Sequence, residues 1–175
     1  MPADQTHPAI SNVLAERVTQ HLNDEERNLV AVLDAVRDLH QSLRELDGEA
    51  LAQALQSETI ALRDAEILQP QRKQIRDEAA RELGLTSQEF TLGVLVQKTT
   101  GSLRATVAES RQKLTEMSVE LDRLNRQNAA MIQQSLMLIR GIVSRLTRTA
   151  GSGESYNAGG IREEAHVGSL VQWGG

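Results

Sequence analysis

Few side chains in this sequence are placed to do chemistry, and the first to consider are its histidines. The four histidines lie at positions 7, 21, 40 and 166, a spacing that matches no tetrahedral metal site. A di-metal site in a helical bundle needs two Glu-x-x-His motifs and further glutamates, whereas this chain has one such motif, from Glu163 to His166. His40 adjoins an apolar seam, which indicates a half-buried packing residue. We therefore expect neither a metal nor another cofactor.

Catalytic groups of other kinds are equally hard to find. The chain has no cysteine, which excludes thiolate nucleophiles, thiolate metal ligands and disulfides. It has no nucleophile elbow and no glycine loop of the kind that binds phosphate. Only 2% of its residues are aromatic, so a thick core with enclosed pockets is not expected. The sequence thus predicts a protein that binds, not an enzyme.

The residues that could bind a partner lie on one long amphipathic segment, residues 102–149. In its first half, apolar residues recur at steps of three and four and form a narrow seam, interrupted by Ser110. The seam continues through Asn128, Met131, Ser135, Leu138 and Ile142. A second apolar stripe opens beside it at Ile132, Leu136, Ile139, Val143 and Leu146. So wide an apolar face is typical either of the middle of a core or of a surface that binds a partner.

The charge changes where the face widens. Residues 1–122 carry 13 basic and 21 acidic side chains, whereas residues 123–153 carry five arginines and no acidic residue. The wide face therefore has a basic border on an otherwise acidic chain. The formal net charge of −5 argues against a nucleic-acid-binding body.

The other helices follow from the same periodicity. Apolar residues at steps of three and four predict helices over residues 12–46 and 49–83, with a short turn at Asp47 and Gly48. Pro70 predicts a kink or a break near residues 68–69, and Gly84 predicts the C-terminal cap of the second helix.

A short helix should precede the long last one. The capping-box pattern from Thr86 to Glu89 predicts its start, so we expect a helix over residues 87–97 and the last helix over residues 102–149. The fold class is therefore all-α. Residues 1–150 should form an elongated antiparallel helical bundle or coiled coil of three long helices and one short helix.

The end of the chain differs in composition. Seven of the 12 glycines fall within residues 151–175, so we expect this Gly-rich tail to be flexible. It holds Tyr156 and Trp173, which are either exposed by accident or anchors that become ordered on binding. The N-terminus lacks the basic and apolar regions of a signal peptide, and no apolar run approaches the roughly 20 residues that span a bilayer. We expect a cytoplasmic protein.

Asn128 occupies a core position of the last helix, between Leu124 and Met131. An amide buried without a partner costs about 1 to 3 kcal/mol, so we expect Asn128 to hydrogen-bond across the bundle or to backbone. Two interpretations stay open. The residue either sets the register of the bundle or makes a polar contact inside a binding groove.

The order of these features resembles the FlgN-type flagellar export chaperones. The run LDRLNRQNAAMIQQSL at residues 121–136, followed by SYNAGG at residues 155–160, is similar to that family's C-terminal signature of paired asparagines, an apolar helix and a short Tyr-Gly-type tail. A leucine-seamed first helix, an acidic/Gly turn and a second helix that closes with Leu83-Gly84-Leu85 are similar too. The likeness covers residues 12–160. Asn157 stands where the family has a glycine, and residues 161–175 have no counterpart.

The resemblance implies a small all-helical chaperone of bacterial flagellum biogenesis. It would bind hook-filament junction proteins, of FlgK and FlgL type, and hold their assembly-prone terminal helices until the flagellar type III export gate receives them. An incoming amphipathic helix needs a wide apolar groove with a charged border, and residues 131–146 supply both. The residues expected to bind the partner are Asn128, Met131, Ile132, Ser135, Leu136, Ile139, Ile142, Val143, Leu146 and Tyr156.

Two other functions fit the same helix. A structural or regulatory coiled-coil protein would bury the wide face by self-association as a homodimer. A peripheral membrane protein would lay residues 131–148 on anionic lipid without inserting stably, although the few arginines on the opposite face suit this role poorly.

Overall fold

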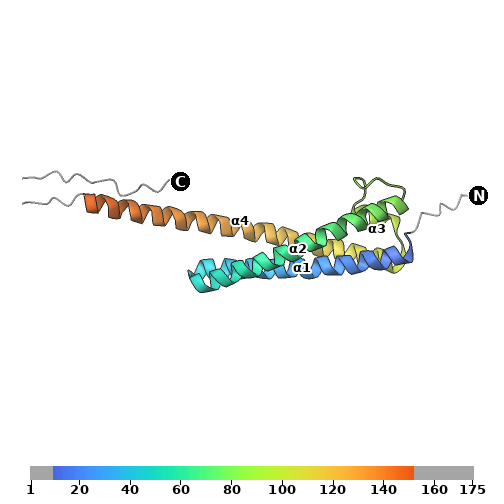
Figure 1. The fold of residues 1–175 in the computed structure, drawn as a ribbon, viewed down its shortest axis with the longest axis horizontal. Helices are drawn as coiled ribbons and strands as arrows, with labels where there is room; N and C mark the ends of the chain where they lie inside the picture. Colours follow the sequence, from blue (N-terminus) through green and yellow to red (C-terminus); the bar gives the residue numbers. More distant parts are fainter. Residues whose placement is uncertain (1–9, 152–175) are drawn as a thin grey trace, which may run out of the picture. The chain divides into compact units, whose positions relative to one another are not determined.

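The computed structural model describes residues 10–151, with the side chains of residues 10–147, and every regular element in this range is a helix. α1 comprises Asn12–Glu45, α2 Gly48–Glu82, α3 Leu92–Lys98 and α4 Gly101–Gly151 (Figure 1). The chain divides into two units, the first ending at Ala129 and the second beginning at Ala130, so that α4 contributes to both. The all-α helical bundle expected from the sequence is confirmed.

α1 and α2 form an antiparallel hairpin. The Ser11 hydroxyl caps α1 by accepting a hydrogen bond from the backbone N–H of Leu14, at 3.3 Å. At the other end of α1, Leu46 adopts the left-handed conformation with φ 56°. The Asp47 carboxylate then accepts the backbone N–H groups of Glu49 and Ala50 and caps α2. The turn expected at residues 47–48 is thus formed by residues 46–47.

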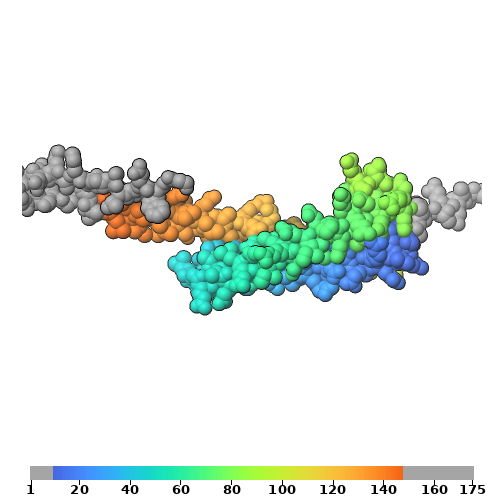
Figure 2. Space-filling model, in the orientation of Figure 1, coloured from blue at the N-terminus to red at the C-terminus, as the bar shows by residue number. Residues whose placement is uncertain are grey.

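Polar contacts fix the register of the hairpin along its length. Arg17 pairs with Glu78, and Arg72 pairs with Glu25. The side-chain amide of Asn28 donates to the Ala61 carbonyl at 2.8 Å. Figure 2 shows the result as one continuous surface, with α2 in green lying along α1 in blue.

α2 ends in a Schellman motif centred on Gly84, the residue expected to cap it. The N–H of Leu85 donates to the Ala80 carbonyl at 2.8 Å, and the N–H of Gly84 donates to the Arg81 carbonyl at 3.2 Å. Gly84 has φ +66°, a conformation that glycine adopts without steric cost.

Pro70 lies inside α2, and the helix is not broken there. Proline removes one backbone hydrogen bond and costs about 3 kcal/mol in a helix interior. Flanking contacts offset this cost, because Ala61 and Ala79 on either side of Pro70 are buried in the core. The packing of α2 thus overrides the local preference.

α3 begins five residues later than the sequence suggested. The capping-box contacts do form: the N–H of Thr86 donates to the Glu89 carboxylate at 2.9 Å, and the N–H of Glu89 donates to the Thr86 hydroxyl at 3.3 Å. They close a turn that places Phe90 in the core, and the helix starts only at Leu92, capped by the Thr91 hydroxyl. The pattern was identified correctly, but the expected helix start at residue 87 was wrong.

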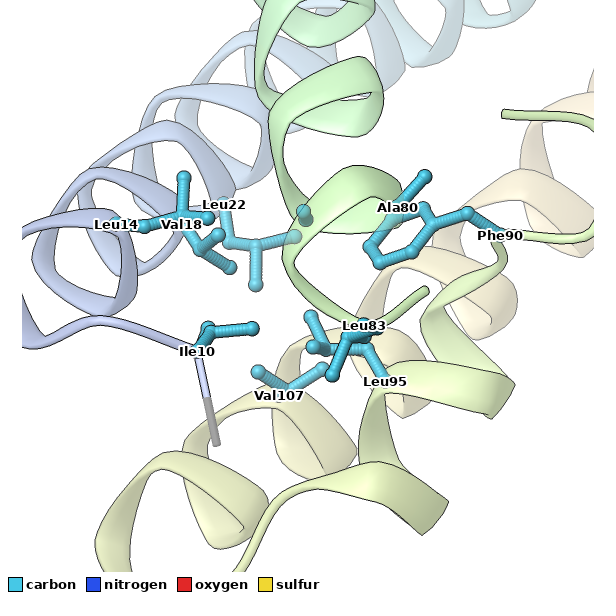
Figure 3. Packing of buried hydrophobic residues seen from close by; sticks show 10 residues of the cluster. Ile10, Leu14, Val18, Leu22, Ala80, Leu83, Phe90, Leu95 and Val107 are labelled. Carbon is cyan, nitrogen blue, oxygen red and sulfur yellow. The ribbon is translucent and has the colours of Figure 1, made fainter. Parts of the chain in front are cut away.

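Two apolar clusters form the core of the first unit. The larger lies where all four helices contribute, and Figure 3 shows Leu83, Leu95 and Val107 next to one another at its centre. Its other buried members are Ile10, Leu14, Val18, Leu22, Ala79, Ala80 and Phe90. The second cluster joins α1, α2 and α4 through Val32, Leu33, Val36, Ala61 and Leu124.

Within the first unit, α4 runs parallel to α1 and antiparallel to α2. Lys113 lies 3.7 Å from Glu26, and Arg37 lies 2.9 Å from Glu120, so positions on α1 and α4 advance together. α2 already ends where α1 begins, since Ser11 hydrogen-bonds Glu82, and α3 with its two loops reverses the chain at this end so that α4 runs back along α1.

Candidate partner-binding face

The part of α4 that belongs to the first unit packs through a narrow seam. Val107, Ser110, Leu124 and Asn128 are buried on it. At about 100° per residue these positions lie within roughly one third of the helix circumference. The chain itself therefore covers the side chains of this seam, whereas Val119, outside the seam, is exposed.

Asn128 is buried, with 3% of its surface exposed, and both ends of its amide are paired with α1. Its Nδ2 donates to the Val36 carbonyl at 3.3 Å, and its Oδ1 lies 2.8 Å from Nδ1 of the half-buried His40. Because an amide oxygen only accepts, this contact requires the proton on Nδ1 of His40. The expected hydrogen bonds across the bundle and to backbone are both present, which fits a residue that sets the register of α4 against α1.

The part of α4 that belongs to the second unit differs sharply in exposure. Met131 is half-buried, and every described side chain from residue 132 to residue 147 is exposed. The exposed apolar residues include Leu136 at 46%, Ile139 at 56% and Leu146 at 64%. Isolated exposed leucines are common in proteins, but a contiguous run over four helical turns is typical of a surface that binds a partner.

These side chains share one side of the helix, which we call the α4 face. At about 100° per residue the face covers roughly 160° of the circumference and runs for about 24 Å. It consists of Met131, Ile132, Ser135, Leu136, Leu138, Ile139, Ile142, Val143 and Leu146. This segment is orange in Figure 2.

Arginines border the α4 face on both sides. Arg140 is next to Leu136 and Val143 on one side of the helix, and Arg145 is next to Ile142 on the other. Both arginines are exposed. The described residues therefore combine an exposed apolar stripe with a cationic edge, an arrangement that can bind an amphipathic helix.

Most residues expected to bind a partner thus lie together. Met131, Ile132, Ser135, Leu136, Ile139, Ile142, Val143 and Leu146 are on the α4 face, whereas Asn128 is turned into the bundle. Tyr156 lies outside the described residues. Leu138, which the sequence places on the apolar seam but not among the binding residues, is 69% exposed and belongs to the face.

A comparison with protein families decides the identity of the chain, because the model of the FlgN protein family matches residues 14–164. The chain belongs to the FlgN family. No curated protein and no solved structure matches it. FlgN proteins are flagellar export chaperones and not enzymes. The match includes the whole α4 face and most of the bundle.

The FlgN-type bundle also contains a cavity of about 550 Å³ within its first unit. It is lined mainly by apolar side chains, with the buried His21 and the paired Glu25 and Arg72 at its wall. Nε2 of His21 lies 3.0 Å from the Glu25 carboxylate, yet neither ring nitrogen makes a hydrogen bond of good geometry. Burial lowers the pKa of His21 and outweighs the nearby Glu25, which raises it.

The remaining sites considered from the sequence add little to this FlgN-family chain. Among residues 10–151, no group of three or more His, Asp or Glu side chains is arranged to hold a metal ion. The Glu163–His166 motif lies outside the described residues. None of the helices in the described range has the length and apolarity needed to cross a bilayer.

Proposed function

We propose that this FlgN-family chaperone binds hook-filament junction proteins of FlgK and FlgL type through the α4 face. It holds their assembly-prone terminal helices in the cytoplasm and delivers them to the flagellar type III export gate. The family membership supports the general role of an export chaperone. The choice of the α4 face rests on its exposed apolar side chains.

The observation that carries the proposal is the exposure of this stripe over residues 132–146. An apolar stripe about 24 Å long matches one face of a partner helix of roughly 16 residues. Burying such side chains is favourable by roughly 25 cal/mol per Å² of apolar surface, which provides the driving force for binding. Met131 adds an adaptable side chain to the face.

The narrow seam of α4 supports this face by anchoring the same continuous helix. Val107, Leu124 and Asn128 hold residues 101–128 against α1 and α2. A helix that is already formed loses less conformational entropy when a partner binds. The bundle therefore acts as the scaffold and the α4 face as the binding surface.

The test is co-expression with the junction proteins, followed by gel filtration with light scattering. The wild-type chain should form a stoichiometric complex, and Leu136→Asp or Ile139→Asp should weaken it about 100-fold, as expected for loss of a central apolar anchor. Val119→Asp is the matched control, because Val119 is 66% exposed on the same helix but lies in the first unit, away from the α4 face. Circular dichroism should show all three variants equally folded.

Two results would contradict the proposal. One is a complex that survives both substitutions on the α4 face. The other is a homodimer that excludes added junction protein and is dissociated by Leu136→Asp, which would favour the coiled-coil alternative.

A further inference from the structure

We propose that the cavity of the first unit binds a small anionic amphiphile, a molecule with an apolar body of two or three aromatic rings and one acidic group. The cavity has a volume of about 550 Å³. An apolar cavity of about 150 Å³ is enough to hold benzene, so this cavity has room for a molecule with several rings. The proposal goes beyond the proposed function, because every residue that lines the cavity belongs to the first unit and the α4 face belongs to the second.

All four helices contribute apolar side chains to the cavity wall. The lining includes Leu22 and Leu29 of α1, Ile75 of α2, Leu92 of α3 and Leu114 of α4. An apolar body placed among these side chains removes its own surface and part of the wall from water, which favours binding. The wall thus provides the affinity for the rings of the ligand.

The cavity is accessible beside Ser118. This residue is exposed, and together with Leu92 and Leu114 it also lines a neighbouring depression of about 390 Å³. The depression continues along α4 to Val119, which is exposed as well. A small molecule can therefore enter between α3 and α4 without unfolding of the bundle.

The charged side chains of the wall leave one positive charge uncompensated. Glu25 and Arg72 form an ion pair, so their charges cancel. His21 is neutral at neutral pH, because burial lowers its pKa below the ordinary value of 6.5. Arg76 is the remaining charged residue of the wall, and it forms no ion pair within the described part of the chain. Charge complementarity therefore favours an anion as the occupant.

Arg76 is placed to hold the acidic group at the edge of the cavity. Its side chain is exposed, and its Nε donates to the Ser87 carbonyl at 2.5 Å, which fixes the guanidinium group. The neighbouring carboxylate of Asp77 does not line the cavity, and it accepts a hydrogen bond from the Ser87 hydroxyl at 2.6 Å. The two Nη groups of Arg76 can therefore donate to a carboxylate or a sulfonate.

Size and charge together favour a small molecule over a side chain of a protein partner. The ring of a phenylalanine or tyrosine is close to benzene in size and would fill only a fraction of the cavity. Neither of these side chains is charged at neutral pH. An aspartate or glutamate brings the charge without the apolar body. An aromatic acid supplies both in one molecule.

The experiment titrates the full chain with 1-anilinonaphthalene-8-sulfonate, a sulfonate with three rings whose fluorescence rises in an apolar site. N-phenyl-1-naphthylamine is the matched neutral probe, because it has the same rings without the sulfonate. Both probes should bind at one molecule per chain. Arg76→Gln should weaken binding of the sulfonate about tenfold and leave the affinity for the neutral probe unchanged. Arg63→Gln, which changes an exposed arginine of α2 that does not line the cavity, should change neither affinity.

Three further variants locate the probes. Ala65→Phe fills the cavity from α2, and Ser118→Phe fills it from α4 at an exposed position, so each should abolish binding of both probes. Leu136→Asp on the α4 face should leave both affinities unchanged. Circular dichroism should show that the variants are folded. If Ala65→Phe fails to fold, Ser118→Phe still decides the location.

Three results would overturn the inference. The first is an affinity for the sulfonate that Arg76→Gln does not change. The second is binding that survives Ser118→Phe and is lost in Leu136→Asp, which would place the probes on the α4 face. The third is binding that appears only after Glu154, Glu163 and Glu164 are changed to Gln, which would assign the site to acidic residues of this chain. The complex with junction proteins is measured separately, and its loss bears on the proposed function alone.

Discussion

The two parts of α4 have similar apolar periodicity but opposite surroundings. Between Gly101 and Ala129 most apolar side chains form a narrow seam that packs against α1, α2 and α3. From Ala130 onward the stripe is wider, bordered by arginines, and exposed in the described residues. Periodicity and the width of the stripe thus mark a helix and its apolar side, whereas only the exposure in the structure separates the second part from the covered seam.

The difference also separates two energetic roles along one helix. Residues such as Leu124 contribute to the free energy of folding, because the folded chain removes them from water. Residues such as Leu136 contribute little to folding and are available for the free energy of binding. Substitutions in the two parts should therefore change different measured quantities.

The largest expected effect contrasts two leucines of α4. Leu124→Ala should lower the free energy of unfolding by about 3 kcal/mol, because Leu124 is 4% exposed and its loss leaves a cavity. Leu136→Ala, at a residue that is 46% exposed, should change it by less than about 0.5 kcal/mol. Urea unfolding followed by circular dichroism measures both. Similar losses for the two variants would abolish the distinction between seam and face.

Asparagines offer a second contrast. Asn128→Ala should cost about 1 to 3 kcal/mol, because it removes the partner of Nδ1 of the half-buried His40 and of the carbonyl of the buried Val36. Asn125→Ala, on the exposed side of the same helix, should change stability by no more than about 0.5 kcal/mol. The same unfolding assay applies, and a neutral Asn128→Ala would show that these hydrogen bonds do not hold α4 on α1.

Gly141 tests how stable the helix of the α4 face is by itself. A Cβ at this position meets nothing within 4 Å, so Gly141→Ala should stabilise the local helix by about 1 kcal/mol without a clash. Amide hydrogen exchange should slow around residue 141, while the unfolding midpoint of the bundle stays the same. A shift of that midpoint would mean that the two parts of α4 unfold as one.

A pH dependence should be confined to the bundle. Burial lowers the pKa of His21 below its ordinary value of 6.5, so the unfolded chain takes up a proton at that residue more readily than the folded chain. Stability should therefore be complete above pH 6.5 and fall as the pH drops through the window between 6.5 and the lower folded pKa. His21→Gln should flatten this slope in urea unfolding at pH 7.5, 6.5 and 5.5.

Asn125→Ala is the control for the pH experiment, because it removes an exposed side chain that does not titrate and leaves His21 in place. It should keep the slope of the wild-type chain, whatever its effect on absolute stability. Parallel slopes for the wild type and His21→Gln would contradict the assignment. Binding to the α4 face should not change with the His21 substitution.

Much of the fold could be predicted because each long helix has strong periodicity and clear ends. Ser11 and Gly84 act at helix ends as their residue types suggest. The helix start expected at residue 87 was wrong because tertiary packing decided the outcome: the Thr86–Glu89 pair closes a turn, and Phe90 enters the core. Of the kink or break expected at Pro70, the break does not occur, because α2 continues through this residue.

The candidate site was predictable as a face but not as a free surface. Spacing places Leu136 and Ile139 on one side of a helix, yet it does not reveal whether another part of the chain covers them. The partners of Asn128 on α1 are 88 and 92 residues away in the sequence, so no local pattern indicates them. For that reason the sequence alone could not show that Asn128 is buried in the bundle and does not lie on the α4 face.

The central claim is that the α4 face is exposed in the free chaperone and covered in the complex. Hydroxyl-radical footprinting tests it directly, with the full chain measured alone and bound to a junction protein. We expect Leu136 and Ile139 to be oxidised in the free chain and protected in the complex, while Val119 reacts equally in both. Protection of Leu136 and Ile139 already in the free monomer, or unchanged reactivity on complex formation, would contradict the account.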